Sequence, residues 1–182
     1  MSWIQIVDPT AAQGELAHLY TAIDKAHGGI ANLHRALSLN PRALQDHLSL
    51  YMTTVFAESP LSRGLRERIG TIVSATNGCE YSVQRHAASA RELGTPPDVA
   101  TALTRAQVPE NVRADERMLL EWAKRATVAP GDAAEADVQA LRAAGWSDRA
   151  ILDATMAIAY FNFCNRIVML LGVEPEDESS AG

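Results

Sequence analysis

The sequence has little cysteine, no cluster of basic residues and no long hydrophobic run. Its two cysteines, Cys79 and Cys164, are too few for a disulfide scaffold. The 16 Lys and Arg residues are spread along a chain of net charge −6, which argues against nucleic acid as a partner. The longest apolar run, near residues 157–161, is too short to cross a bilayer, and the first residues lack a secretory signal pattern. We therefore expect a cytoplasmic protein without a membrane partner.

Sequence motifs for cofactors and metals are missing as well. The sequence contains no Gly-x-Gly-x-x-Gly or phosphate loop, so it implies no nucleotide cofactor. The histidines His18, His27, His34 and His47 are scattered, and none stands at metal-ligand spacing from a cysteine or carboxylate. The sequence thus predicts neither a cofactor nor a metal site.

The composition is that of a folded protein with one domain. Hydrophobic residues make up 47% and charged residues 21% of the 182 residues, values typical of a soluble globular chain. Residues 173–182 are acidic and rich in serine, without periodicity. We predict a single domain over residues 1–172 and a flexible acidic tail over residues 173–182.

Helix start and stop signals recur along the chain, whereas alternating β-branched runs are almost absent, which predicts an all-α fold. Asp8-Pro9 predicts the start of a helix that runs to His27 and stops at Gly28-Gly29. By the same reasoning, further helices are expected from Pro41 through Val55, between the Ser59-Pro60 and Asn77-Gly78 breaks, from 79 to about 94, and over 98–106, 114–127, 134–144 and 148–171.

The last of these helices carries apolar residues around almost its whole circumference. Such a belt suits a helix that is central in the fold or buried against a partner subunit, so we expect a homo-oligomer. Cys164 lies on this helix between Phe163 and Asn165, where a buried, inert thiol is the commonest outcome. A resolving role for Cys164 requires the fold to bring it beside Cys79.

The residues that indicate chemistry are Glu67, Cys79, Ser82 and His86. Cys79, Ser82 and His86 are spaced i, i+3 and i+7, which places them on one helix face. Because Gly78 ends the previous helix, Cys79 stands in the first turn of a new one, where free N–H groups and the helix dipole favour a thiolate.

Glu67 belongs to the preceding helix, so the fold decides whether its carboxylate reaches His86. A carboxylate that orients an imidazole facing a thiol is the arrangement that nucleophilic cysteine chemistry needs. Three structural alternatives stand beside it: Cys79 only packs, Glu67 is a solvated charge, or His86 lies at the surface.

These residues occupy the spacing of a known signature, Glu…Cys-x-x-Cys-x-x-x-His, with Ser82 at the second cysteine position. The chain therefore resembles the alkyl hydroperoxidase D / carboxymuconolactone decarboxylase family, and in particular its peroxidase-related branch. The stretches Asn77–Tyr81, Gly29–Asn32, Asn40-Pro41 and Phe161–Glu174 extend the resemblance over nearly the whole chain. It implies an all-helical, oligomeric protein.

The resemblance also implies roles for the four residues in an antioxidant peroxidase cycle. The residue at the position of Ser82 is the cysteine that a hydroperoxide oxidises to a sulfenic acid, and the residue at the position of Cys79 closes a disulfide with it. Glu67 and His86 match the residues that relay protons and activate the thiol. An external thiol or a lipoyl-bearing partner then reduces the disulfide.

The serine at position 82 departs from this pattern, because a hydroxyl forms neither a sulfenic acid nor a disulfide. Three interpretations follow. Cys79 acts alone as a one-cysteine peroxidase, with Ser82 as a hydrogen-bond donor and an outside thiol as resolving agent; the chain is a cysteine-to-serine variant of an active enzyme; or the scaffold serves another role.

Two other function classes compete with a peroxidase. In a carboxymuconolactone decarboxylase-like enzyme, Glu67 and His86 do acid–base work on a small lactone acid and the cysteine is incidental. A non-catalytic oligomeric scaffold needs neither group. A hydrolase with Ser82 as nucleophile is disfavoured, because no Gly-x-Ser-x-Gly elbow is present.

Overall fold

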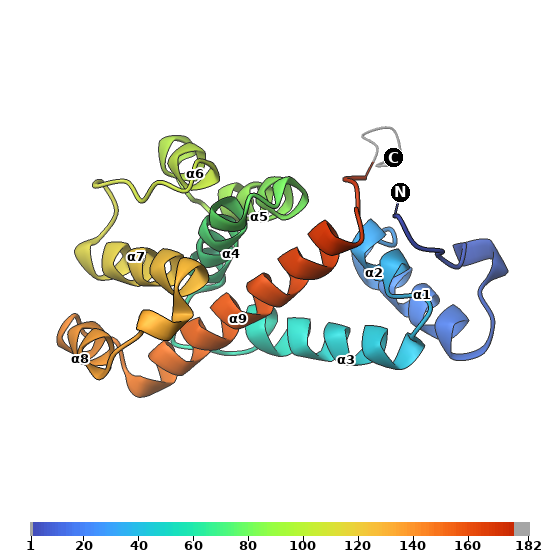
Figure 1. Cartoon of the computed structure of the whole chain (residues 1–182), viewed down its shortest axis with the longest axis horizontal. Helices are drawn as coiled ribbons and strands as arrows, with labels where there is room; N and C mark the ends of the chain where they lie inside the picture. Colours follow the sequence, from blue (N-terminus) through green and yellow to red (C-terminus); the bar gives the residue numbers. More distant parts are fainter. Residues whose placement is uncertain (1, 177–182) are drawn as a thin grey trace. The chain divides into compact units, whose positions relative to one another are not determined.

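The computed structural model describes residues 2–176, which form two compact units (Figure 1). Unit 1 comprises the described residues up to Tyr51 and from Arg166 on, and unit 2 comprises Met52–Asn165. All regular elements within residues 2–176 are helices, and no strand occurs there, so the predicted all-α fold is confirmed. Within the same residues, no helix combines the length and apolarity needed to cross a membrane.

Unit 1 is a small helical cluster around an apolar core. Its elements are the 3-10 turn η1 (Pro9–Ala11), α1 (Gly14–His27), α2 (Asn32–Ala36), α3 (Pro41–Tyr51) and the end of α9 (Asp148–Leu170). Helix α1 packs against α3. The core of this cluster is formed by Leu16, Leu19, Tyr20, Ile23 and Leu44, all of them buried.

The first predicted helix is wrong at its start, because the chain forms a short turn before α1. The Asp8 carboxylate accepts a hydrogen bond from the Thr10 N–H at 2.9 Å, but it caps only the three-residue turn η1. The backbone is extended at Ala12, with ψ 140°, and Gly14 opens α1 with φ +57°, a conformation that favours glycine. The predicted stop holds, since Gly28 ends α1 with φ 70°.

The segment predicted as a tail begins with packed residues in unit 1. Val173 is buried. The Asn32 side chain donates to the Glu174 carbonyl at 3.0 Å, and the Asn32 backbone N–H donates to the Glu176 carboxylate at 2.8 Å. Residues 177–182 lie outside the described residues, and the division of the chain at residue 172 stays a prediction.

Unit 2 is built around α4 (Arg63–Asn77), which packs against α5 (Glu80–Glu92), α6 (Pro97–Thr104) and α7 (Ala114–Val128), as Figure 1 shows. The remaining elements of this unit are the π-helical turn η2 (Met52–Phe56), the turn η3 (Pro130–Asp132), α8 (Glu135–Ala143) and the part of α9 up to Asn165. Helix α4 has buried residues on most of its circumference, so a polar side chain on it is enclosed by protein.

Local sequence signals explain where the helices of unit 2 begin and end. The Ser62 hydroxyl accepts from the Leu65 N–H at 3.2 Å at the start of α4, and Gly78 ends that helix with φ 71°. The buried Arg66 guanidinium on α4 donates to the carbonyl oxygens of Thr54 in η2 and of Ala57 just after it, at 3.3 and 2.9 Å. Arg66 thus satisfies carbonyl groups of the π-helical turn that takes the place of the last part of the helix predicted from Pro41 to Val55.

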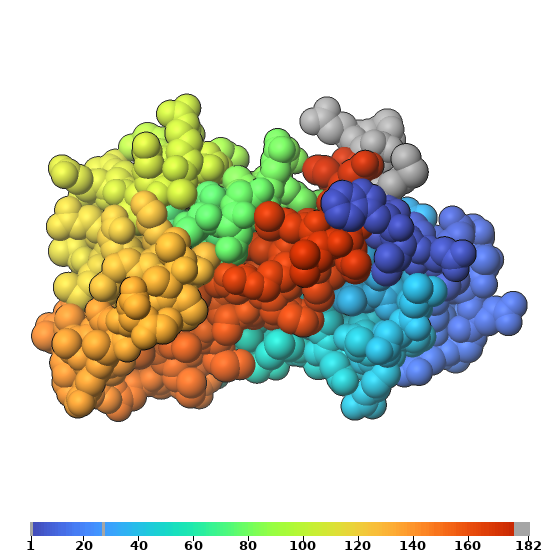
Figure 2. All heavy atoms as spheres, in the orientation of Figure 1, coloured from blue at the N-terminus to red at the C-terminus, as the bar shows by residue number. Residues whose placement is uncertain are grey.

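The apolar belt predicted for α9 is only partly buried in unit 2. Phe161 is fully buried, whereas Leu152, Met156 and Phe163 keep 56, 40 and 46% of their surface exposed. This part of α9, drawn in orange, reaches the molecular surface in Figure 2. The homo-oligomer that the belt suggested stays a prediction.

Candidate functional site

The packing of α5 on α4 brings the predicted carboxylate and imidazole together in unit 2. The Glu67 Oε2 atom lies 2.8 Å from the His86 Nδ1 atom, and both side chains are buried. A hydrogen bond of this length to a carboxyl group fixes the orientation of the imidazole. Neither residue therefore adopts the solvated alternative considered above.

The Glu67 carboxylate has a second charged neighbour. Its Oε1 atom lies 3.9 Å from the Nε atom of Arg63, one turn earlier on α4. The Arg63 guanidinium stands 4.0 Å above the ring of Phe56, which restrains it. A carboxylate in so buried a position needs such partners, because an isolated buried charge is strongly unfavourable.

Cys79 and Ser82 form the second pair of the site. Cys79 is the N-cap residue of α5, and its N–H donates to the Ser74 carbonyl at 2.9 Å. The Cys79 Sγ atom lies 3.4 Å from the Ser82 Oγ atom. Only 1% of Cys79 and 3% of Ser82 is exposed, so the thiol meets a hydroxyl in a place that bulk water does not reach.

The two pairs lie on one side of α5 without a direct hydrogen bond between them in the described part of the chain. His86 lies seven positions after Cys79, or about 10 Å along the helix axis. The structure thus brings Cys79 to Ser82 and Glu67 to His86.

Gly70 and Phe161 shape this site, and the spacing of the motif does not point to them. The Phe161 ring contacts the His86 ring edge-on, with 4.6 Å between centroids. A Cβ atom on Gly70 would stand 2.8 Å from Phe161 and 3.1 Å from His86. Gly70 therefore leaves room for the imidazole. Because glycine is unfavourable inside a helix, its presence there was the signal in the sequence that could have pointed to this close contact.

Two polar contacts fix α9 against the end of α4, close in sequence to Cys79. The Asn77 amide donates to the Asn162 side-chain oxygen at 3.0 Å, and the Ser74 hydroxyl donates to the Asn165 side-chain oxygen at 3.2 Å. Cys164 lies between these two asparagines on α9 and is buried. Burial raises the pKa of Cys164 to about 12, so the reduced thiol stays protonated at neutral pH.

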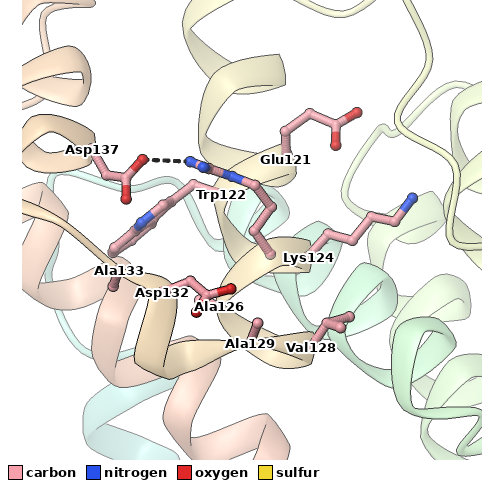
Figure 3. A pocket seen from close by; sticks show the side chains of 10 residues that line it. Glu121, Trp122, Lys124, Ala126, Val128, Ala129, Asp132, Ala133 and Asp137 are labelled. Atoms are coloured by element: carbon pink, nitrogen blue, oxygen red, sulfur yellow. Dashed lines mark hydrogen bonds and ion pairs between the residues drawn. The ribbon is translucent and has the colours of Figure 1, made fainter.

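Unit 2 also contains a cavity of about 370 Å³ on α7, η3 and α8, shown in Figure 3. Trp122 and Val128 supply apolar lining. Arg125 and Asp137 form an ion pair of 2.7 Å at its edge. Its lining includes none of the four residues predicted from the motif, so this cavity is distinct from the site on α4 and α5.

Comparisons with known proteins agree with the predicted resemblance. The model of the family described as "Carboxymuconolactone decarboxylase family" matches residues 42–125. An uncharacterized peroxidase-related protein from Silicibacter sp. is 26% identical with a TM-score of 0.86, and the match covers 99% of this chain and 94% of that one. A peroxidase-related protein from Ralstonia eutropha, described as an alkylhydroperoxidase core, is 25% identical with a TM-score of 0.88 over 97% of this chain and 93% of that one.

A more distant structure shares the fold alone. The debrominase Bmp8 in complex with 2,3,4-tribromopyrrole is 17% identical, with a TM-score of 0.79 over 95% of this chain and 91% of that one. No curated protein matches the sequence significantly. The resemblance inferred from the motif is confirmed by the family model and by the two peroxidase-related structures.

Proposed function

We propose that this protein, which resembles the alkyl hydroperoxidase D / carboxymuconolactone decarboxylase-like family, is a peroxidase-related oxidoreductase that uses Cys79 as its reactive thiol. One observation carries the proposal: a buried thiol in contact with a hydroxyl shares a helix side with a buried carboxylate–imidazole pair. This is the set of groups needed to hold a thiolate and to move the proton that a departing alkoxide requires.

The reaction starts with attack of the Cys79 thiolate on a hydroperoxide oxygen. An S–O bond forms, the O–O bond breaks, and the alcohol leaves after it takes a proton. The proton that leaves the Cys79 thiol reaches the alcohol by way of the His86 imidazole, which Glu67 holds in place, through the substrate or a water molecule. In the structure the Cys79 thiol donates to the Ser82 oxygen; once the thiol is deprotonated, the Ser82 hydroxyl donates to the thiolate and stabilises the charged form that reacts.

An external thiol completes the cycle. It attacks the sulfenic acid on Cys79 to give a mixed disulfide and water, and a second thiol then releases Cys79 and leaves as a disulfide. A small thiol or a lipoyl-type dithiol supplies both electrons. Because Cys79 is buried, we expect small hydroperoxides to react faster than bulky ones.

A turnover assay tests this function. The full chain is mixed with tert-butyl hydroperoxide and dithiothreitol, and loss of hydroperoxide is followed for the wild type, Cys79→Ala and Gln84→Ala. Gln84 is an exposed residue of α5 on a different face of the helix from Ser82 and His86, and it serves as the control. We expect Cys79→Ala to reduce consumption to the rate in buffer. Equal consumption by the wild type and Cys79→Ala would contradict the proposal.

A second candidate function rests on the Glu67–His86 hydrogen bond. Because His86 bonds Glu67 and not Cys79 among the described residues, the pair is also suited to acid–base work on a γ-lactone carboxylic acid. Release of carbon dioxide from such a lactone acid separates the two functions. Decarboxylation that survives Cys79→Ala but is lost in His86→Ala supports the decarboxylase, and a scaffold shows neither activity.

A further inference from the structure

We propose that Cys164 is the resolving thiol of this chain, and that it captures the sulfenic acid on Cys79 to form an intramolecular Cys79–Cys164 disulfide. This inference rests on the proposed function, since it needs an oxidised Cys79. In it, Cys79 takes the oxidised role that Ser82 cannot fill, and Cys164 replaces the external thiol in the attack on the sulfenic acid, so that the external thiol only reduces the resulting disulfide.

The contacts on either side of Cys164 place it near the start of α5. Asn162 and Asn165, which flank it on α9, bond Asn77 and Ser74 at the end of α4. The Ser74 carbonyl in turn accepts the Cys79 N–H at 2.9 Å. The part of α9 that carries Cys164 is thus attached to the residues that lead into Cys79.

The face of α9 on which Cys164 lies is the one turned toward the site. Phe161, Cys164 and Asn165 are spaced i, i+3 and i+4 and share a helix face. Phe161 contacts the His86 ring on α5, and Asn165 contacts Ser74 on α4. Cys164 is 4% exposed, whereas the adjacent Phe163 is 46% exposed. Its thiol therefore points into the unit, on the side that meets α4 and α5.

The electrostatics of Cys164 agree with this placement. Burial is the main reason that its pKa rises to about 12, a hydrogen bond from Tyr160 opposes this rise, and an interaction with Cys79 adds a smaller rise, in keeping with the side of the unit that both cysteines face. In the reduced protein Cys164 therefore stays a neutral thiol, which leaves Cys79 as the sulfur that meets the hydroperoxide.

The resolving step balances without a further oxidant. The Cys164 sulfur attacks the Cys79 sulfur, an S–S bond forms and the S–O bond of the sulfenic acid breaks. The thiol proton of Cys164 joins the departing hydroxide to give water. The hydrogen bond from Tyr160 lowers the pKa of Cys164 and so favours the thiolate that makes this attack. Two equivalents of an external thiol then reduce the disulfide.

Peptide mapping under non-reducing conditions tests the inference. The full chain is treated with one equivalent of tert-butyl hydroperoxide without an external thiol, free thiols are alkylated, and the protein is digested with trypsin. Cleavage after Arg68, Arg85, Arg149 and Arg166 places Cys79 in peptide 69–85 and Cys164 in peptide 150–166. We expect these two peptides to be joined, in protein that remains monomeric in denaturing gels, and to separate with dithiothreitol.

The other results of this experiment are distinguishable. An oxidised Cys79 together with an alkylated Cys164, or a disulfide between the Cys79 residues of two chains, overturns the inference and leaves the proposed function intact. A Cys79 that remains an alkylatable thiol overturns both.

The conservative variant Cys164→Ser gives a second readout that a purely structural role would not change. In this variant the sulfenic acid on Cys79 has no intramolecular partner, so we expect it to persist, to react with dimedone and to advance to the sulfinic acid with excess hydroperoxide. Equal dimedone labelling of the wild type and Cys164→Ser would overturn the inference. Thermal melts of both proteins show whether the variant is folded.

Discussion

Each unit of the molecule contains buried histidine, but the surroundings give the two sets different chemistry. In unit 1 the rings of His34 and His47 meet edge-on at 5.6 Å, and burial lowers the pKa of His47 to about 4. In unit 2 His86 is similarly buried, but its Nδ1 atom lies 2.8 Å from the Glu67 carboxylate. Burial alone thus produces a neutral imidazole that packs, whereas a buried carboxylate orients an imidazole for proton transfer.

Replacing Glu67 removes the carboxylate that distinguishes the surroundings of His86 from those of His47, and we expect this change to have the largest effect. We expect Glu67→Gln to lower hydroperoxide turnover by about 10²–10³-fold, the contribution typical of general acid–base catalysis. Glu80→Gln, at an exposed position in the first turn of α5, is the matched control and keeps the wild-type rate. The same turnover in both variants would show that Glu67 has no part in the reaction.

The buried His47 of unit 1 predicts that the free energy of unfolding depends on pH. Because the pKa of His47 is about 4 in the folded chain and near 6.5 in the unfolded chain, only the unfolded chain takes up this proton between these values. Stability from this group is therefore complete above pH 6.5 and falls as the pH drops toward 4. We expect a loss of about 2–3 kcal/mol between pH 7.5 and 4.5.

Urea titrations at the two pH values measure this loss, with His47→Leu as the comparison. The variant has no imidazole at position 47, so its unfolding free energy should change less with pH than that of the wild type. An identical pH dependence in the two proteins would show that His47 is not the group responsible.

The space around His86 gives the third prediction. Gly70→Ala places a methyl group 2.8 Å from the Phe161 ring and 3.1 Å from His86, so we expect it to lower the free energy of unfolding by about 1–2 kcal/mol. It should also slow turnover, because the imidazole has to move. The control is Gly64→Ala on the same helix, where the new Cβ atom meets Leu93 at the ordinary distances of 3.5–3.6 Å.

Thermal or urea unfolding of the two alanine variants compares these positions directly. Gly64→Ala should be neutral or slightly stabilising, since alanine restricts the unfolded chain. If Gly70→Ala is as stable and as active as Gly64→Ala, the close approach of Phe161 and His86 to α4 affects neither the stability nor the turnover of the protein.

The smallest effect is expected from the Ser82 hydroxyl. At the lower end of its range, a hydrogen bond to a charged group contributes about 1.5 kcal/mol, so Ser82→Ala should slow the oxidation of Cys79 by about tenfold. Stopped-flow measurement of the first turnover, with the exposed Gln84→Ala as control, gives this rate. An unchanged rate in Ser82→Ala would mean that the 3.4 Å contact does not support the thiolate.

Much of the fold follows from local signals in the sequence. Ser62 and Gly78 define the ends of α4, and the spacing of Cys79, Ser82 and His86 places them on one side of α5. The contact between Glu67 and His86 could not be predicted in this way, because it depends on how α4 and α5 pack.

The failures of the sequence analysis have similar physical causes. Asp8-Pro9 signals the start of a helical turn but not its length, so the break at Ala12 was missed. The roles of Gly70 and Phe161 depend on the close approach of three helices, which periodicity along one helix does not report.

The most direct test of Cys79 as the reactive thiol is a trapping experiment. Wild-type protein and the Glu67→Gln variant are treated with one equivalent of tert-butyl hydroperoxide in the presence of dimedone, and peptide 69–85 is analysed by mass spectrometry over time. We predict rapid oxidation of Cys79 in the wild type, as a dimedone adduct or a disulfide, and much slower oxidation in Glu67→Gln. An unmodified Cys79 in the wild type, with the hydroperoxide still present, would contradict the proposed chemistry.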